Sequence, residues 1–318
     1  MNYKKIVVAG GGVLGSQIAF QSAFCEYDTV ILVREEDNQE AINKSLSNLK
    51  DTYLKAIKEM KDEKEYYRGI VGSSNFNYDE LKSSINTSLD RIKIETSQEI
   101  ALKDADLLIE SITENIKIKE NFYKQISNLL EEKTVIVTNS STLLPSKLAP
   151  YTGRMNKFLA MHFANTIYKN NMVEIMGHNK TDDKYFDEIV AFANSIKMLP
   201  LEIKKEKSGY LLNSMLVPFL LSALDIYANG VSDPKTIDDA WKLGTSAPKG
   251  PFEIIDTVGL MTAKNIVDQY QKVPDLFDPL LRRMMLPYNY DGMLRILNKY
   301  IEEGKLGKST GEGFYKYN

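Results

Sequence analysis

Short runs of apolar and β-branched residues alternate with amphipathic stretches over the first two thirds of the chain. The runs lie at Ile6–Ala9, Thr29–Val33, Ile92–Ile94, Asp106–Glu110, Thr134–Thr138, Phe158–His162, Met172–Met176 and Pro200–Ile203. Most of them are continuously apolar, which is typical of strands in a parallel sheet with both faces covered. Stretches with helical spacing separate them, notably at 13–25, 115–131 and 181–197. The pattern therefore predicts a doubly wound, Rossmann-type α/β domain over residues 1–203.

Two regions depart from this alternation. Residues 36–90 are charged and helical in pattern, and they predict a helical hairpin inserted between the second and third strands. Beyond residue 203 only helical patterns remain, at 209–228, 259–272, 276–286 and 291–303. We therefore expect residues 204–318 to form an all-helical domain. Its first helix is apolar around most of its circumference, which indicates that it is buried on more than one side. A subunit interface would bury the second side, so we expect a homodimer.

A glycine-rich turn joins the first strand to the first helix. Gly10, Gly12 and Gly15 have the G-x-G-x-x-G spacing, directly after the buried run that ends at Ala9. Such glycines permit a tight turn, a close approach of a pyrophosphate to the backbone, and close packing of helix on strand. The first N–H groups of the helix, which starts at Val13 and Leu14, then face the phosphates. The turn predicts a dinucleotide site that includes all five residues.

Composition limits the remaining possibilities. The 318 residues exceed the size at which a single core stops growing, which agrees with two domains. A net charge of −3 gives no reason to expect a nucleic-acid partner, and no apolar stretch is long enough to span a membrane. The single cysteine, Cys25, excludes an intramolecular disulfide and favours a reducing, cytoplasmic location. We expect no metal site.

The two histidines of the chain differ in their setting. His162 ends an apolar run, at the carboxyl end of a predicted strand where open α/β sheets bind ligands, and Glu174 lies in the next run. A carboxylate on one ring nitrogen stabilises the imidazolium, and the other nitrogen can then take a proton from a substrate hydroxyl. Spacing alone fits a buried structural histidine equally well. His178 lies in a turn before a helix, and we expect it at the surface.

Seven motifs occur in the order in which the L-3-hydroxyacyl-CoA dehydrogenase family carries them, over nearly the whole chain. They are Glu110–Ile116 (ESITENI), Asn139–Thr142 (NSST), His162–Asn165 (HFAN), Val173–Ile175 (VEI), Gly209–Asn213 (GYLLN), Gly250–Asp256 (GPFEIID) and Gly311–Tyr315 (GEGFY). The chain therefore resembles that family. The resemblance implies a Rossmann domain, a helical domain at 204–318 for substrate binding and dimerisation, and oxidation of a 3-hydroxyl to a ketone.

The resemblance also assigns roles to individual residues. It implies that His162 is the catalytic base, that Glu174 orients it, that Ser141 holds the 3-oxygen and that Asn213 lies near the substrate carbonyl. It further implies cofactor contacts for Asn139, Glu114, Lys119 and Asn165. Without the resemblance, Ser141 reads equally well as a turn cap and Asn213 as a bridge between helices.

Three departures from the family bear on cofactor and substrate. Arg34 follows the second strand where the family usually has an acidic residue, and an arginine there favours the 2′-phosphate of NADP. Glu35, Glu36 and Asp37 follow at once, and Glu35 turned inward would bind the ribose of NAD and leave Arg34 to stack on adenine. The loop after His162, which borders the substrate, lacks the family's Asn-Pro, so the resemblance does not assign the acyl group. The inserted hairpin has no clean match, so the resemblance does not assign coenzyme A contacts.

These observations predict an NAD- or NADP-dependent 3-hydroxyacyl-CoA dehydrogenase with a small-molecule substrate, expected to be an acyl-CoA. One alternative is the same hydride chemistry on a free 3-hydroxy acid, such as L-gulonate or a carnitine-like compound, because residues 140–148 and the region of Tyr168 resemble the L-gulonate dehydrogenase and lambda-crystallin branch. The other alternative is a non-catalytic dinucleotide-binding structural protein.

Overall fold

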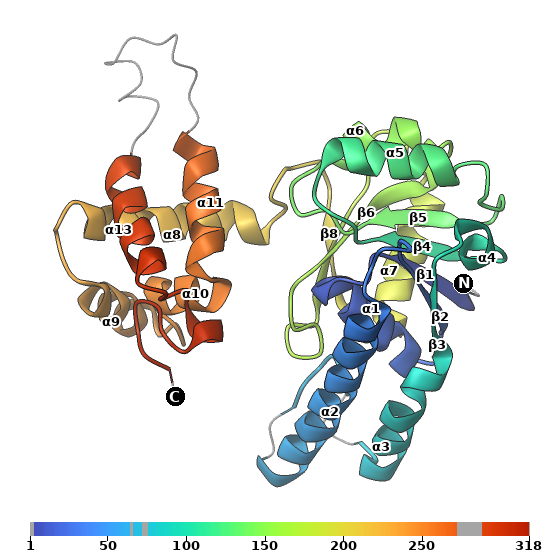
Figure 1. Cartoon of the computed structure of the whole chain (residues 1–318), viewed down its shortest axis with the longest axis horizontal. Helices are drawn as coiled ribbons and strands as arrows, with labels where there is room; N and C mark the ends of the chain where they lie inside the picture. Colours follow the sequence, from blue (N-terminus) through green and yellow to red (C-terminus); the bar gives the residue numbers. More distant parts are fainter. Residues whose placement is uncertain (1–2, 64–65, 72–75, 272–287, 318) are drawn as a thin grey trace. The chain divides into compact units, whose positions relative to one another are not determined.

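The computed structural model describes residues 3–63, 66–71, 76–271 and 288–317. The chain forms two compact units, Met1–Leu211 and Leu212–Asn318, and each is described by itself (Figure 1). The first unit carries every β-strand assigned among the described residues, and the second is built from helices.

The first unit is built on an eight-stranded sheet. Its strands are β1 (Lys5–Ala9), β2 (Asp28–Leu32), β3 (Ile92–Glu95), β4 (Leu107–Glu110), β5 (Val135–Thr138), β6 (Phe158–Phe163), β7 (Met172–Met176) and β8 (Leu199–Ile203). They lie in the order β3-β2-β1-β4-β5-β6-β7-β8, and β1 to β6 are parallel. This arrangement confirms the predicted doubly wound, Rossmann-type fold.

The last two strands reverse direction. β7 is antiparallel to β6, and β8 is parallel to β7. The connection between β6 and β7, residues 164–171, carries no helix, and a parallel crossover normally requires a dozen or more residues. The short connection therefore produces an antiparallel pair, in which His162 lies directly opposite Glu174.

Helices cover both faces of this sheet. They are α1 (Val13–Phe24), α2 (Gln39–Glu63), α3 (Tyr78–Thr87), α4 (Gln98–Leu102), α5 (Ile116–Ile126), α6 (Pro145–Leu148) and α7 (Asp183–Ser195). α1, α2 and α7 share one buried cluster with the sheet, and α4, α5 and α6 share another on the opposite face. α2 and α3 lie side by side as a helical hairpin between β2 and β3 (Figure 1).

α5 is shorter than the predicted 115–131. It ends at Ile126, and the carbonyls that follow bind a side chain instead of continuing the helix. The Arg154 guanidinium donates to the carbonyl oxygens of Ser127 and Leu130, at 3.4 and 3.0 Å. It also donates to those of Glu131 and Thr134. One distant arginine thus satisfies the backbone where the helix stops.

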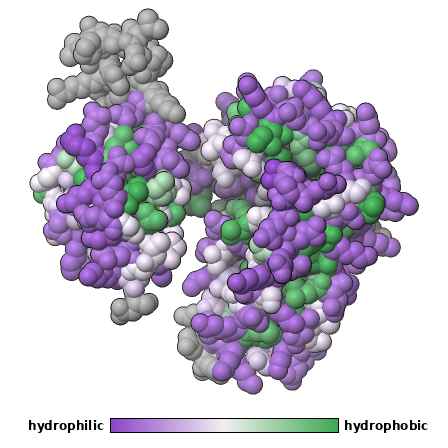
Figure 2. All heavy atoms as spheres, viewed as in Figure 1, coloured by the Kyte–Doolittle hydropathy of each residue, from purple (hydrophilic) through white to green (hydrophobic). Residues whose placement is uncertain are grey.

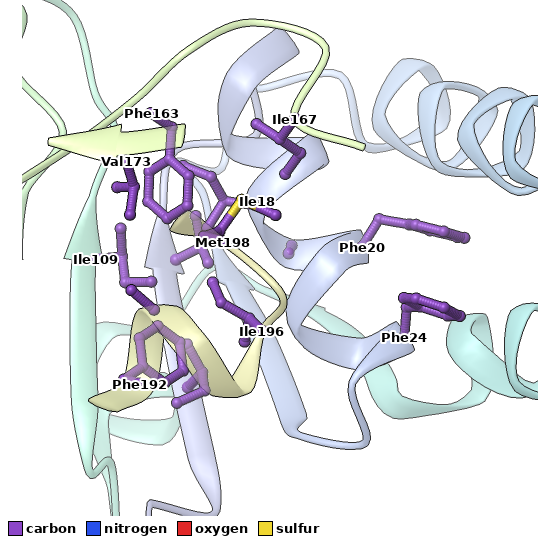
Figure 3. Close-up of a cluster of buried hydrophobic side chains, with 14 of the residues drawn as sticks. Ile18, Phe20, Phe24, Ile109, Phe163, Ile167, Val173, Phe192, Ile196 and Met198 are labelled. Atoms are coloured by element: carbon purple, nitrogen blue, oxygen red, sulfur yellow. The ribbon is translucent and has the colours of Figure 1, made fainter. Parts of the chain in front are cut away.

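A cluster of apolar side chains packs α1 and α7 against the sheet. Figure 3 shows Ile18 of α1 and Phe192 of α7 in the same buried cluster as Ile109 and Val173 from the strands. The side chain of Gln21, on the same helix α1, is polar and fully buried beside this cluster.

Gln21 joins three separate segments. Its amide nitrogen donates to the Gly69 and Ile196 carbonyls, both at 2.8 Å, and its oxygen accepts from the Tyr53 hydroxyl at 2.6 Å. Gln21 therefore fastens α1 to both the inserted hairpin and the residues after α7.

The second unit contains α8 (Leu212–Ala228), α9 (Pro234–Thr245), α10 (Pro251–Val258), α11 (Leu260–Gln271) and α13 (Tyr290–Glu302). The predicted helix at 276–286 falls outside the described residues. Two buried carboxylates organise the unit: Asp238 accepts from the first N–H groups of α10, and Asp256 accepts from the backbone of Phe314 and Tyr315. Burial raises the pKa of both carboxyls.

No described helix is both long and apolar enough to cross a membrane. In the view of Figure 2, polar side chains cover most of the surface and apolar ones form separate patches.

Candidate active site

The glycine turn has the geometry that a phosphate-binding backbone requires. Gly10 has φ +109°, and a Cβ there would lie 2.5 Å from the Ser111 carbonyl oxygen. A Cβ on Gly15 would collide with the Gly10 carbonyl, so the helix packs on the turn only with glycine. Gly12 has open space where a Cβ would be, and no acidic residue lies in the first turn of α1. The turn therefore leaves an anion free access to the helix N-terminus.

A cavity of about 720 Å³ extends from this turn to the end of β2. Gly10 and Gly12 line one part of it, and Arg34, Asp37 and Asn38 line another. This size suits a nucleotide-sized ligand. Glu35, which the sequence suggested for the ribose, is exposed and is not among the lining residues, whereas Asp37 is.

Ser141, His162 and Glu174 form one hydrogen-bonded row. His162 Nδ1 lies 3.0 Å from Glu174 Oε2, and His162 Nε2 lies 3.1 Å from Ser141 Oγ. Because a carboxylate only accepts, Nδ1 carries the proton, and in the neutral ring Nε2 accepts from the Ser141 hydroxyl. Glu174 is fully buried, and it is fixed further by the Leu211 N–H, which donates to Oε1 at 2.7 Å.

The segment before α8 covers this row. The Tyr210 ring is stacked on the His162 imidazole, with 4.7 Å between ring centroids and 30° between planes. Tyr210 is fully buried, and its φ of +53° lies in the left-handed region. Burial, together with Glu114 and Glu174 nearby, raises the pKa of the Tyr210 phenol. Sequence reasoning assigned no role to Tyr210, because only its presence in the Gly209–Asn213 motif distinguished it.

Glu114 holds the turn that carries Ser141. Its Oε1 accepts from the Ser140 hydroxyl at 2.6 Å, from the Ser141 and Thr142 N–H groups at 3.1 and 3.0 Å, and from the Thr142 hydroxyl at 2.8 Å. Burial opposes ionisation of Glu114, but these hydrogen bonds and the Lys119 ammonium outweigh it, so the pKa of its carboxyl is lowered. An ionised Glu114 therefore fixes the backbone beside Ser141.

Lys119 lies behind Glu114 in a buried ion pair. Its ammonium is 2.5 Å from Glu110 Oε1 and 3.5 Å from Glu114 Oε2, and only 1% of its side chain is exposed. Glu110 also accepts from the Tyr123 and Thr138 hydroxyls, both at 2.8 Å. In this structure Lys119 thus supports the Ser141 turn. The sequence signalled Glu110 only as part of a motif.

The remaining predicted residues are distributed around this centre. Asn139 is nearly buried, and its side chain accepts from the Phe163 N–H at 2.9 Å, which joins the ends of β5 and β6. Val13 is 74% exposed at the start of α1, Leu14 is half-buried, and Asn165 is exposed after β6. Asn213 lies in the first turn of α8 in the other unit. Direct ligand contacts of these residues stay predictions.

The expectation for His178 is wrong. Its side chain is buried rather than exposed, because the backbone satisfies both ring nitrogens: Nε2 lies 3.0 Å from the Met155 carbonyl oxygen, and Nδ1 accepts from the Lys180 N–H at 3.3 Å. Cys25 is half-buried, and burial raises the pKa of its thiol to about 12, which agrees with a packing role. The described residues contain no cluster suited to a metal ion.

The fold, the glycine turn and the Ser–His–Glu row define a nicotinamide-dependent oxidoreductase of the doubly wound class. Residues 5–207 match the 3-hydroxyacyl-CoA dehydrogenase NAD binding domain, and residues 209–317 match the C-terminal domain of the same family. The chain belongs to the 3-hydroxyacyl-CoA dehydrogenase family. This confirms the predicted family, enzyme class and NAD cofactor.

Individual relatives extend along the whole chain. Human mitochondrial hydroxyacyl-coenzyme A dehydrogenase is 33% identical over 99% of this chain and 91% of its own length. The 3-hydroxybutyryl-CoA dehydrogenase of Clostridioides difficile is 30% identical over 99% of both chains. A solved diketoreductase, described as acting on dicarbonyl compounds, is 40% identical over all of both chains with a TM-score of 0.82.

Proposed function

We propose that this protein interconverts a 3-hydroxyl and a 3-ketone with His162 as the general base. The observation that carries the proposal is the row Ser141 Oγ, His162 Nε2 and Nδ1, and Glu174 Oε2, whose links are 3.1 and 3.0 Å. It combines a nitrogen able to accept a proton with a buried carboxylate that stabilises the imidazolium formed.

In the oxidative direction His162 Nε2 takes the proton of the substrate hydroxyl, and Ser141 donates a hydrogen bond to the same oxygen. Glu174 keeps the proton on Nδ1 and compensates the positive charge of the imidazolium. Glu114 keeps the Ser141 turn in place, and Tyr210 keeps the imidazole plane fixed. NAD supplies the hydride acceptor when it is bound in the cavity beside Gly10–Gly12. In the reductive direction the imidazolium returns its proton to the ketone oxygen.

Two substrate classes are compatible with this chemistry. The relatives named for acyl-CoA substrates favour a 3-hydroxyacyl-CoA, which we propose first. The diketoreductase likeness, at higher identity than these relatives, favours a second candidate, a dicarbonyl compound or 3-hydroxy acid without coenzyme A. The loop after His162 differs from the family pattern in the sequence, which supports keeping the second candidate.

A substrate panel tests the proposal. Oxidation of NADH would be followed with acetoacetyl-CoA, acetoacetate and a 3,5-dicarbonyl ester at matched concentrations. We expect turnover with acetoacetyl-CoA, and turnover confined to the CoA-free compounds would replace the first substrate class by the second. Turnover with none of these 3-ketones, by a protein that binds NADH, would contradict the proposed function.

We also propose a homodimer formed by the helical unit. Large apolar side chains are exposed on its helices, notably Met215, Trp241, Leu243 and Met261. An interface between two copies would remove such apolar side chains from water. Sedimentation at micromolar concentration is expected to give twice the chain mass, and a monomer would contradict the proposal. A cytoplasmic location stays a prediction, because the human and pig relatives are named as mitochondrial.

A further inference from the structure

The residues after β2 form a small charged cluster at one end of the cavity. Arg34 Nη2 lies 2.7 Å from Asp37 Oδ1, and the Arg34 N–H donates to Asp37 Oδ2 at 2.9 Å. Arg34 Nη1 also pairs with Glu36 Oε1 at 3.0 Å. Both Arg34 and Asp37 line the cavity, and Arg34 is the one cation among its described lining residues.

Arg34 and Asp37 differ in how far their side chains are exposed. The Arg34 side chain is 72% exposed, whereas only 28% of Asp37 is exposed, and a turn closes between them because the Asp37 N–H donates to the Arg34 carbonyl. The hydrogen bond from Arg34 keeps the pKa of the Asp37 carboxyl low, so Asp37 is ionised at neutral pH. The four residues 34–37 carry one positive and three negative charges.

The pairing of Arg34 with Asp37 weakens the expectation, based on Arg34 alone, that the site favours NADP. A free arginine after β2 would pair with the 2′-phosphate of NADP. Here the guanidinium already faces a carboxylate, and a phosphate dianion that approached it would also meet Asp37 and Glu36. The 2′-hydroxyl of NAD carries no charge, and it can donate a hydrogen bond to a carboxylate oxygen.

We infer that Asp37 is the residue that selects NAD over NADP, because it occupies Arg34 and presents a carboxylate at the adenosine end of the cavity. Asp37 thus has the role of the acidic residue that relatives usually carry directly after this strand, which is to accept the ribose hydroxyl and to repel a 2′-phosphate. Arg34 positions the carboxylate, and it becomes a phosphate ligand only when that carboxylate is removed. The inference rests on the proposed nicotinamide-dependent function.

Binding titrations on the full-length protein test this without any substrate. The dissociation constants of NADH and NADPH would be measured by cofactor fluorescence for the wild type, Asp37→Asn, Arg34→Ala and the double variant. Glu40→Gln is the matched control, because Glu40 is exposed in the first turn of α2 and does not line the cavity.

We expect the wild type to bind NADH at least about tenfold more tightly than NADPH, which is the size of one charge-assisted contact. Asp37→Asn should tighten NADPH by about ten- to a hundredfold and weaken NADH. The gain for NADPH should disappear in the double variant, because it needs Arg34. Glu40→Gln should change the ratio by less than about twofold, since solvent screens an exposed charge.

Three results would overturn the inference: wild-type binding of NADPH as tight as or tighter than that of NADH, an unchanged ratio in Asp37→Asn, or an equal NADPH gain in the double variant. The last would mean that loss of negative charge acts without Arg34. Failure to bind either cofactor would contradict the proposed function as well, whereas equal binding of both would contradict only the role of Asp37.

Discussion

Replacing Glu174 by glutamine changes one atom of the catalytic row and therefore tests its logic closely. The Leu211 N–H donates to Oε1, so the amide oxygen of glutamine must occupy that position. The amide NH₂ then faces His162 Nδ1, where the carboxylate oxygen Oε2 lay at 3.0 Å. Since NH₂ only donates, Nδ1 must accept, and the ring proton moves to Nε2.

The wrong tautomer has a calculable consequence. Nε2 with a proton cannot take one from the substrate hydroxyl, and it donates to Ser141 instead of accepting. General-base assistance is worth about 10²–10⁴ in rate, and a tautomer-reversing change beside a catalytic histidine approaches the upper value. We expect kcat of Glu174→Gln to fall by about that factor in the oxidative direction. NADH affinity should stay unchanged, because Glu174 does not line the cavity.

Steady-state turnover, cofactor titration and thermal unfolding would be measured on the same preparation. Glutamine has the shape of glutamate and keeps both hydrogen bonds, so Tm should shift by only a few degrees, about the effect of 1 kcal/mol. Glu202→Gln, the same substitution at an exposed site on β8, serves as the control. A folded Glu174→Gln protein with kcat within about threefold of the wild type would refute the tautomer argument.

Three further predictions concern other parts of the first unit. Ser141→Ala should lower kcat by about ten- to a hundredfold in the turnover assay while Tm is kept, and wild-type kcat would remove the serine from the mechanism. Asp106→Asn should lower the free energy of unfolding at pH 7 by about 1–2 kcal/mol, because the carboxylate accepts from Lys133 at 2.7 Å and from two backbone N–H groups. Burial opposes ionisation there, but these bonds lower the pKa of the Asp106 carboxyl. The difference in unfolding free energy between variant and wild type, measured in urea, should therefore shrink as the pH falls from about 4 through the lowered pKa. A difference that stays constant over this range would contradict the prediction. Gln21→Leu should lower the free energy of unfolding by about 2–4 kcal/mol in the same assay, because it leaves two buried carbonyls unpaired, and a neutral effect would show that water replaces the amide.

Much of this molecule follows from local patterns in the sequence. Buried strands read as apolar runs, and the spacing of Gly10, Gly12 and Gly15 identifies a turn in which two of the glycines have no room for a side chain. The His162–Glu174 pair was predicted from two adjacent runs. The structure adds that they are direct cross-strand neighbours, because the loop between them is short.

The contacts that the sequence did not reveal are made by long side chains, whose partners depend on the folded structure. Arg34 lines the cavity, and its contact with a cofactor stays a prediction; its pairing with the carboxylate three residues later depends on turn geometry, which the sequence does not show. The contact of Lys119 with the cofactor stays a prediction, and the sequence did not indicate its buried ion pair with Glu110, nine residues away along the chain. Tyr210 stacks on His162 from a position far along the sequence, so no local pattern indicates that contact.

Single-turnover reduction of the ketone by enzyme-bound NADH, compared between the wild type and His162→Gln, tests most directly whether His162 is the proton-transferring group. The rate of NADH consumption is expected to fall by about 10²–10⁴-fold, with NADH affinity unchanged because His162 does not line the cavity. A His162→Gln protein that binds NADH and consumes it at the wild-type rate would contradict the central claim.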